Sequence, residues 1–239
     1  GPKLVTVNHP DNVSTGVLSN GYEYTAGDYN ICDQAEGSPF QDGAGTPADP
    51  FIVCTVAQFE NIANNGSYKS YKLGANLDFN NTIHTQGHLN TGSIINGDGH
   101  VILNAVYTLF YYQYELTEVR DLAILGFDSI DNDTSYHGIF SRNTIASSFC
   151  YASEGTWEDI IVQAKLTVTD GQYLGGLAGF KICGTMDVNR YSKNLIDIEV
   201  NNAGTNPSVR FGGMAMYGNH DFTMRNTKIT LSGDLDGTS

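Results

Sequence analysis

The densest group of side chains that could bind a ligand is a run of aromatic residues near the middle of the chain. Tyr107, Tyr111, Tyr112 and Tyr114 lie close together, next to polar neighbours. Exposed tyrosines combine a flat apolar ring with a hydroxyl, so they make platforms for sugar rings or peptide partners. Alternation along a strand predicts Tyr112 and Tyr114 on one face and Tyr111 on the other. The alternative is that the rings close one end of a hydrophobic core.

A short acidic segment offers oxygen ligands for a metal ion. Asp128, Asp131 and Asp133 lie in the sequence F-D-S-I-D-N-D-T-S. Ca²⁺ prefers carboxylate and amide oxygens, so this segment could bind calcium, although its spacing is not that of an EF-hand loop. The alternative is a solvated acidic turn. We expect no cofactor to be required.

A recurring polar position could supply the carboxylates of a carbohydrate-active enzyme. Asp121, Asp159, Asn194 and Asn226 are spaced by 38, 35 and 32 residues. Glycoside hydrolysis needs a converging pair of carboxyl groups, but asparagine replaces aspartate in half of this series. Asp and Asn tolerate left-handed turns, so we expect corners of the fold here rather than catalytic residues. No G-x-S-x-G or Cys–His nucleophile pattern is present, and the sequence favours a protein that is not an enzyme.

Four cysteines indicate disulfides rather than a zinc site, because none lies in a C-x-x-C pair and the six histidines lack zinc spacing. Three pairings are open. We favour Cys32 with Cys54, which closes a loop in the N-terminal region, and Cys150 with Cys183, which links neighbouring repeats. Disulfides imply an oxidising compartment. Free thiols in a cytosolic protein are the alternative.

Composition excludes several classes of partner. The 239 residues include 12 basic and 26 acidic side chains, for a net charge of -14. This balance argues against nucleic acid and against anionic membrane surfaces. No apolar run is long enough for a transmembrane helix, so we expect no membrane insertion. Abundant Gly, Asn, Thr and Tyr favour strands and turns over helices.

A glycine-framed motif recurs along the chain and must organise these residues. It reads Y-H-G-I-F from Tyr136, Y-L-G-G-L-A-G from Tyr173 and R-F-G-G-M-A from Arg210, and alternating runs follow. Self-similarity at this period indicates a solenoid, whose inward side chains stack from turn to turn. One expected column comprises Ile139, Phe140, Leu177 and Met214. A second comprises Ile160, Val162, Leu195, Ile198, Thr227, Ile229 and Leu231.

The chain divides into three parts on this pattern. Residues 1–50 are expected to form an N-terminal cap of strands and loop, residues 51–233 the repeats, and residues 234–239 a linker. One short α-helix is predicted from Thr55 to Ala63, with Thr55 as its N-cap and an apolar face. An open end of a stacked sheet invites aggregation, so the N-terminal region should cover one end.

Residues 43–231 resemble the repeat arrays that carry the GLUG motif. The likeness rests on Gly43-Ala44-Gly45-Thr46, Asp49-Pro50-Phe51, Asn96-Gly97-Asp98-Gly99-His100 and the glycine-framed repeats, in that order. The sequence departs from the pattern at Leu109-Phe110, which lacks the glycines, and in its cysteines. The resemblance implies an all-β, right-handed parallel β-helix in a large secreted or surface-displayed bacterial protein, such as an adhesin.

The function expected from the sequence is therefore binding at a bacterial cell surface. The module would recognise a glycan or a protein on another cell or host, outside the cell and as part of a larger protein. Two alternatives are a polysaccharide lyase or hydrolase on the same scaffold and a structural spacer that projects another domain. Two acids and a base in one cleft would favour the enzyme.

Overall fold

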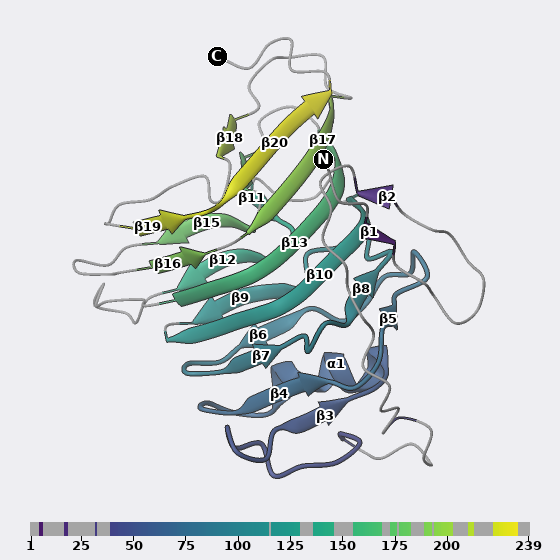
Figure 1. Cartoon of the computed structure of the whole chain (residues 1–239), viewed down its shortest axis with the longest axis vertical. Coiled ribbons are helices and arrows are strands. Elements are labelled where there is room, and N and C mark those ends of the chain that lie inside the picture. The colour runs from purple at the N-terminus through teal and green to yellow at the C-terminus, as the bar shows by residue number, and fades with distance from the viewer. Residues whose placement is uncertain are drawn as a thin grey trace.

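The computed structural model is built mainly from short parallel β-strands (Figure 1). It describes residues 5–6, 17–18, 32, 39–114, 116–129, 136–145, 155–168, 173–175, 177–182, 189–192, 194–202, 210–212 and 222–233. Among the named strands that these ranges contain, only β1 (Val5–Thr6) and β2 (Val17–Leu18) pair antiparallel. The helical part is α1 (Val56–Glu60), which continues into the 3₁₀ turn η2 (Asn61–Asn64). The prediction of a mostly β protein with one short helix is confirmed.

The largest sheet has eleven strands and extends from one end of the described structure to the other (Figure 1). Its members are β3 (Phe51–Val53), β4 (Ser70–Leu73), β5 (Leu77–Asp78), β7 (Ile94–Asn96), β8 (Val101–Leu103), β10 (Thr117–Ser129), β13 (Gly155–Val168), β16 (Asn189–Ser192), β17 (Leu195–Asn202), β19 (Phe222–Arg225) and β20 (Lys228–Gly233). The strands β10, β13, β17 and β20 are successive neighbours in it.

Two smaller parallel sheets alternate with the large one along the chain. One contains β6 (Gly87–Leu89), β9 (Phe110–Tyr114), β12 (Ser141–Ile145) and β15 (Ala178–Ile182). The other contains β11 (Tyr136–Gly138), β14 (Tyr173–Gly175) and β18 (Arg210–Gly212). The chain visits the large, the three-stranded and the four-stranded sheet in the same order through β10 to β12 and again through β13 to β15.

The glycine-framed motifs pair with one another in register. Tyr136 lies opposite Tyr173, which in turn lies opposite Arg210. The third residues of the motifs, Gly138, Gly175 and Gly212, are likewise aligned. The repeat read from the sequence therefore marks equivalent positions on neighbouring strands, and the predicted parallel pairing is confirmed at these three motifs.

The core is formed by side chains that alternate inward along these strands. Val162 pairs with Ile196, and Ala164 pairs with Ile198, so inward residues of neighbouring strands stack on one another. Val162, Ile196 and Ile198 are fully buried. Burying one aliphatic side chain of this size stabilises a fold by about 1.5–3 kcal/mol, so each residue of the repeated column contributes to stability.

The predicted columns are correct in most places and wrong at Leu195. Ile139, Phe140 and Leu177 are buried as expected, and the Phe140 amide donates to the Leu177 carbonyl. Leu195 instead pairs with Ile161 and faces the other side of the sheet. It belongs there to a second apolar cluster, which we call the outer cluster: Val101, Ala123, Leu125, Ile161 and Leu195. Met214 lies outside the described residues.

The corner series is confirmed at three positions and wrong at Asn194. Asp121, Asp159 and Asn226 have φ values of 51°, 55° and 49°, the left-handed conformation expected of such corners. Leu195 pairs with Ile161, so Asn194 is level with Ile160, one position past the corner. Its buried side chain accepts a hydrogen bond from the Ile160 amide and donates to the Trp157 carbonyl.

Part of the N-terminal region covers the free edge of β3. The backbones of Gln41 and Asp42 bond to Ile52, and the ring of Phe40 stacks on Phe51 at 4.6 Å. The hydroxyl of Thr55 accepts from the Gln58 amide, which confirms the predicted N-cap, but the α-helix is shorter than expected because the chain tightens into η2. The described part of residues 1–50 thus blocks pairing at this edge.

Candidate functional site

The first candidate site is a cluster of four rings on β6 and β9, which we call the aromatic face: His88, Tyr111, Tyr112 and Tyr114. The His88 ring lies 4.9 Å from that of Tyr112 and 5.8 Å from that of Tyr114. The rings of Tyr111 and Tyr112 meet edge to face at 4.5 Å. Three of the four predicted tyrosines therefore lie together around His88, a residue that no sequence motif marks as part of a site.

An irregularity in strand pairing explains the composition of the aromatic face. Gly87 pairs with Phe110, but the next residue, His88, pairs with Tyr112. Tyr111 is thus an extra residue in β9, and such a bulge puts two consecutive side chains on one face. The prediction that Tyr111 points away from its neighbours is wrong for this reason, and its ring lies 6.3 Å from that of His88.

The aromatic face is half-buried rather than hidden in the core. Phe110 and Gln113, on the same strand, are buried at 1% and 3% exposure, whereas the three tyrosines keep part of their surface in solvent. The Tyr114 hydroxyl and His88 Nδ1 are 3.5 Å apart. The face can offer ring planes to a ligand together with hydroxyl and imidazole groups that hydrogen-bond at their rim.

Tyr107 stands apart from this cluster. It is half-buried in the segment between β8 and β9. No ring contact joins it to the aromatic face within the described part of the chain. The structure therefore brings together three of the four tyrosines named from the sequence.

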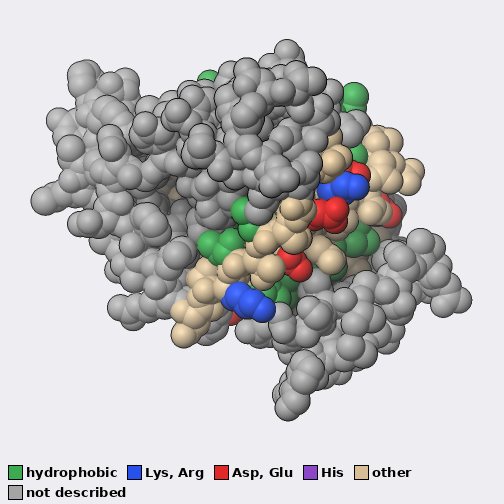
Figure 2. Space-filling view, turned by 90° about the horizontal axis from the view of Figure 1, so that it is seen from above, with side chains coloured by type: hydrophobic (Ala, Val, Ile, Leu, Met, Phe, Trp, Pro, Cys, Tyr) green, Lys and Arg blue, Asp and Glu red, His purple; other side chains and the backbone are tan. Residues whose placement is uncertain are grey.

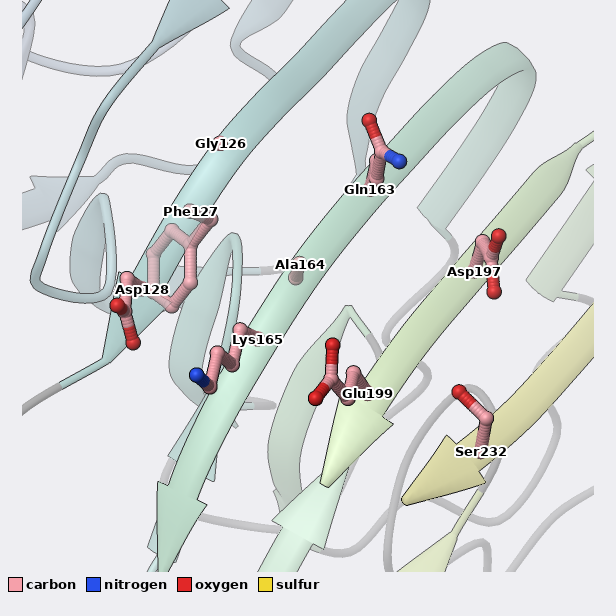
Figure 3. A pocket seen from close by; sticks show the side chains of 9 residues that line it. All are labelled: Gly126, Phe127, Asp128, Gln163, Ala164, Lys165, Asp197, Glu199 and Ser232. Atoms are coloured by element: carbon pink, nitrogen blue, oxygen red, sulfur yellow. The ribbon is translucent and has the colours of Figure 1, made fainter. Parts of the chain in front are cut away.

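The second candidate site is a depression of about 350 Å³ on the outward face of the large sheet, which we call the sheet hollow (Figure 3). Its lining residues come from four neighbouring strands: Gly126, Phe127, Asp128, Gln163, Ala164, Lys165, Asp197, Glu199 and Ser232. The volume is at the lower end of the range of ligand-binding pockets.

Strand register orders the polar side chains of the sheet hollow. In the strand register, Asp128 lies opposite Lys165, Lys165 lies opposite Glu199, and Glu199 lies opposite Ser232. Gln163 and Asp197 form a second pair alongside this row. Neighbouring strands lie about 4.8 Å apart, so an amine in the row is flanked by a carboxylate on each side (Figure 3).

A second bulge, in β10, turns Asp128 toward the sheet hollow. Ile124 pairs with Val162 and Phe127 with Ala164, so β10 contains one extra residue between them. Strict alternation from the inward Ile124 would point Asp128 into the core. Gly126 takes the extra position with φ 65°, a conformation that glycine adopts readily, and Phe127 turns inward instead.

The charges of the sheet hollow are close but not paired with one another. Three carboxylates surround one ammonium group, and no ion pair or side-chain hydrogen bond joins Lys165 to these acids among the described residues. On the described surface seen from above, acidic, basic and hydrophobic side chains are mixed (Figure 2). The polar ends in the sheet hollow thus keep their hydrogen-bonding capacity for water or a ligand.

The predicted calcium segment is only partly covered by the described structure. Asp128 lies in the sheet hollow, whereas Asp131 and Asp133 lie outside the described residues. Within the described ranges, no three His, Cys, Asp or Glu side chains are grouped so as to hold a metal ion. Asp197 and Glu199 were missed as site residues, although the alternation in L-I-D-I-E-V marks both as outward.

The corner carboxylates influence each other. Burial raises the pKa of Asp121 above its ordinary value, and the negative charge of Asp159 on the neighbouring strand adds to this rise. Arg120 acts in the opposite direction, with its Nε 4.0 Å from an Asp121 carboxylate oxygen. These groups lie at the bend of β10 and β13 and do not line the sheet hollow.

The N-terminal disulfide is confirmed. Cys32 and Cys54 are bonded, with their Cα atoms 5.5 Å apart. The bridge packs against Gly74, where an added Cβ would lie 2.8 Å from the Cys32 sulfur. Cys150 and Cys183, the other predicted pair, lie outside the described residues.

Comparisons with known proteins assign no family to the chain. No protein-family model matches it, and no curated protein sequence matches it. A crystal structure of a "putative immunoglobulin A1 protease" from Bacteroides ovatus has a TM-score of 0.41 and 17% identity, over 83% of this chain and 81% of that one. A likeness at this level carries no argument about function. No helix in the described residues is long and apolar enough to cross a membrane.

Proposed function

We propose that this chain is a non-catalytic binding module of a secreted or surface-displayed bacterial protein, built as a right-handed parallel β-helix. The module contacts a glycan or a protein on another cell through the aromatic face. The GLUG-like order of motifs and the recurring parallel pairing support the scaffold. The disulfide supports an oxidising, extracellular setting.

The observation that carries this proposal is the packing of the aromatic face. Its rings support one another at 4.5 to 6.3 Å while remaining half-exposed. Rings that are already held in place lose little conformational freedom when a ligand stacks on them, which favours affinity. Tyrosines in such positions often contribute a large share of binding energy.

A glycan array and a panel of host-cell surface proteins test this function. We expect saturable binding that Tyr112→Ala weakens by about 10-fold or more. Tyr68→Ala is the matched control, because Tyr68 is a 67% exposed tyrosine that does not belong to the aromatic face. Binding that survives Tyr112→Ala and Tyr111→Ala unchanged would refute the proposal for this face.

A carbohydrate-active enzyme is a second candidate, and the sheet hollow is the observation that favours it. The hollow gathers Asp128, Asp197 and Glu199 around Lys165. Polysaccharide hydrolysis uses paired carboxyl groups, and elimination uses a base near the substrate. None of these four residues forms an internal ion pair among the described residues, so all could reach a substrate.

Release of new reducing ends from polysaccharides separates the two candidates. The binding module predicts no release above that of a buffer blank. The enzyme predicts release that falls by a factor of about 100 or more in Glu199→Gln or Asp197→Asn. Tyr112→Ala serves as the comparison variant, because it changes the aromatic face and leaves the sheet hollow intact.

A further inference from the structure

The sheet hollow has a chemical composition that differs from that of the aromatic face, and it suggests its own ligand. We propose that the sheet hollow is a separate binding site for a neutral saccharide, and that it discriminates against acidic sugars. This inference does not depend on the aromatic face, because the two sites lie on different sheets.

The hydrogen-bonding groups of the sheet hollow complement those of a sugar. Asp128, Lys165 and Glu199 form a row of acceptor, donor and acceptor across three strands. Gln163 adds an amide that both donates and accepts, and Ser232 adds a hydroxyl. Sugar hydroxyls also donate and accept, so one sugar ring can satisfy carboxylates and an ammonium group together. Hydrogen bonds to such charged groups are stronger than those between neutral groups.

The row of Asp128, Lys165 and Glu199 is organised before a ligand arrives. These side chains stand on paired strands whose inward residues are packed in the core, which sets their spacing. Among the described residues they make no hydrogen bonds or ion pairs with one another that a ligand would have to break. A preformed polar array reduces the cost of ordering groups on binding.

The charge of the sheet hollow favours a neutral ligand. The hollow carries three carboxylates against one amine, on a chain with a net charge of -14. Uronic acids and sulfated sugars would meet repulsion there. A lysine or arginine side chain of a basic peptide would be attracted by the acids, but it would meet Lys165 in the middle of the row. A neutral ligand rich in hydroxyls avoids both conflicts.

Titration with three soluble probes tests the inference. The probes are neutral oligosaccharides built from glucose, galactose or mannose, oligogalacturonate, and oligolysine. We expect saturable binding of at least one neutral oligosaccharide by calorimetry or NMR, with oligogalacturonate and oligolysine weaker. Lys165→Met and Glu199→Gln should each weaken that binding by about 10-fold or more, because each removes a charge-assisted hydrogen bond.

Two controls keep the test decisive. Lys228→Met removes an exposed lysine from the outward face of β20, outside the sheet hollow, and should leave binding unchanged. The titrations are also run in a Tyr112→Ala background, so that any saccharide binding by the aromatic face is reduced and the remaining binding reports on the sheet hollow. The inference is overturned if no neutral oligosaccharide binds, if oligogalacturonate or oligolysine binds more tightly, or if both hollow variants bind as well as the parent.

Discussion

The aromatic face and the sheet hollow show two ways in which the same parallel scaffold presents side chains to solvent. In the aromatic face, the rings contact one another directly, with His88 4.9 Å from Tyr112. In the sheet hollow, polar ends stay apart, and strand register alone sets their spacing. Both sites lie beside a bulge, at Tyr111 and at Gly126. A single inserted residue can therefore redirect side chains and produce a site on an otherwise regular sheet.

The difference has an energetic consequence. The rings of the aromatic face contact one another, so we expect substitutions there to affect both stability and binding. Among the described residues, the polar side chains of the sheet hollow make no ion pair or hydrogen bond with one another, so substitutions there should affect binding with little effect on stability.

Removing the core residue beneath the aromatic face should have the largest effect. Phe110 is 1% exposed, and its ring lies 5.3 Å from Phe59 and 5.1 Å from Phe140. We expect Phe110→Ala to lower the free energy of unfolding by about 3–5 kcal/mol, because it leaves a cavity that the core fills only in part. Urea unfolding measures this free energy. A loss below about 1 kcal/mol would contradict the packing of Phe110 against Phe59 and Phe140.

Altering the bulge of the sheet hollow should come next. In Gly126→Ala, a Cβ would lie 2.8 Å from Asn104 Oδ1, and the backbone would be strained at φ 65°. We expect a loss of about 1–3 kcal/mol in thermal or urea unfolding. Gly66→Ala is the matched control, because Gly66 has φ 71° but open space around it. This variant should lose less stability than Gly126→Ala. Equal losses would show that the contact with Asn104 adds no cost.

Truncating a ring of the aromatic face should have a moderate effect on stability. Tyr112 contacts both His88 and Tyr111. Aromatic pairs contribute about 0.5–1.5 kcal/mol beyond area burial, so Tyr112→Ala should cost at least that amount in urea unfolding. A double-mutant cycle with His88→Ala should give a coupling energy different from zero. A cycle with no coupling would indicate that the rings lie together without stabilising one another.

Mild acid should destabilise the protein through a buried histidine. Burial lowers the pKa of His84 below its ordinary value of 6.5, while its bond to the Thr108 carbonyl opposes this shift. The unfolded chain then binds the proton more readily than the folded chain. The contribution of His84 to stability is therefore fully present above pH 6.5 and decreases as the pH falls toward the lowered pKa of the folded state. One group changes stability by at most about 1.4 kcal/mol per pH unit.

This pH effect is small over a narrow range of pH, so variants are needed to assign it to particular histidines. The free energy of unfolding should decline from pH 7.5 through 6.5 to 6.0, and His84→Gln should reduce the slope of this decline. His100 is a second buried histidine whose pKa is lowered by burial, so His100→Gln should reduce the slope as well. An unchanged slope in the double variant would assign the pH dependence to other groups.

Neutralising the amine of the sheet hollow should have the smallest effect on stability. Lys165 is exposed and forms no ion pair with a described residue. We expect Lys165→Met to change the free energy of unfolding by no more than about 0.5 kcal/mol. Thermal unfolding measures this. A larger loss would mean that this amine stabilises the surrounding carboxylates, and the two sites would then differ less in their contribution to stability.

The sequence alone was sufficient for features that depend on local chemistry. Thr55 was identified as an N-cap, because its hydroxyl can bond to an amide three residues on. Asp121, Asp159 and Asn226 were identified as corners, because their side chains tolerate a left-handed backbone. The glycine-framed motifs predicted parallel pairing in register, and the Cys32–Cys54 bond was the favoured pairing in its region.

Only the tertiary structure decided which side chains share a surface. Tyr111 joins the aromatic face, and Asp128 turns outward, because one strand of each pair contains an extra residue. Leu195 faces the outer cluster and Asn194 is buried, because the strand register differs by one residue from the alignment of the repeats. Alternation within a strand can be read locally, but the register between strands depends on neighbours far away in the chain. A shift of one residue moves a side chain to the opposite face of the sheet.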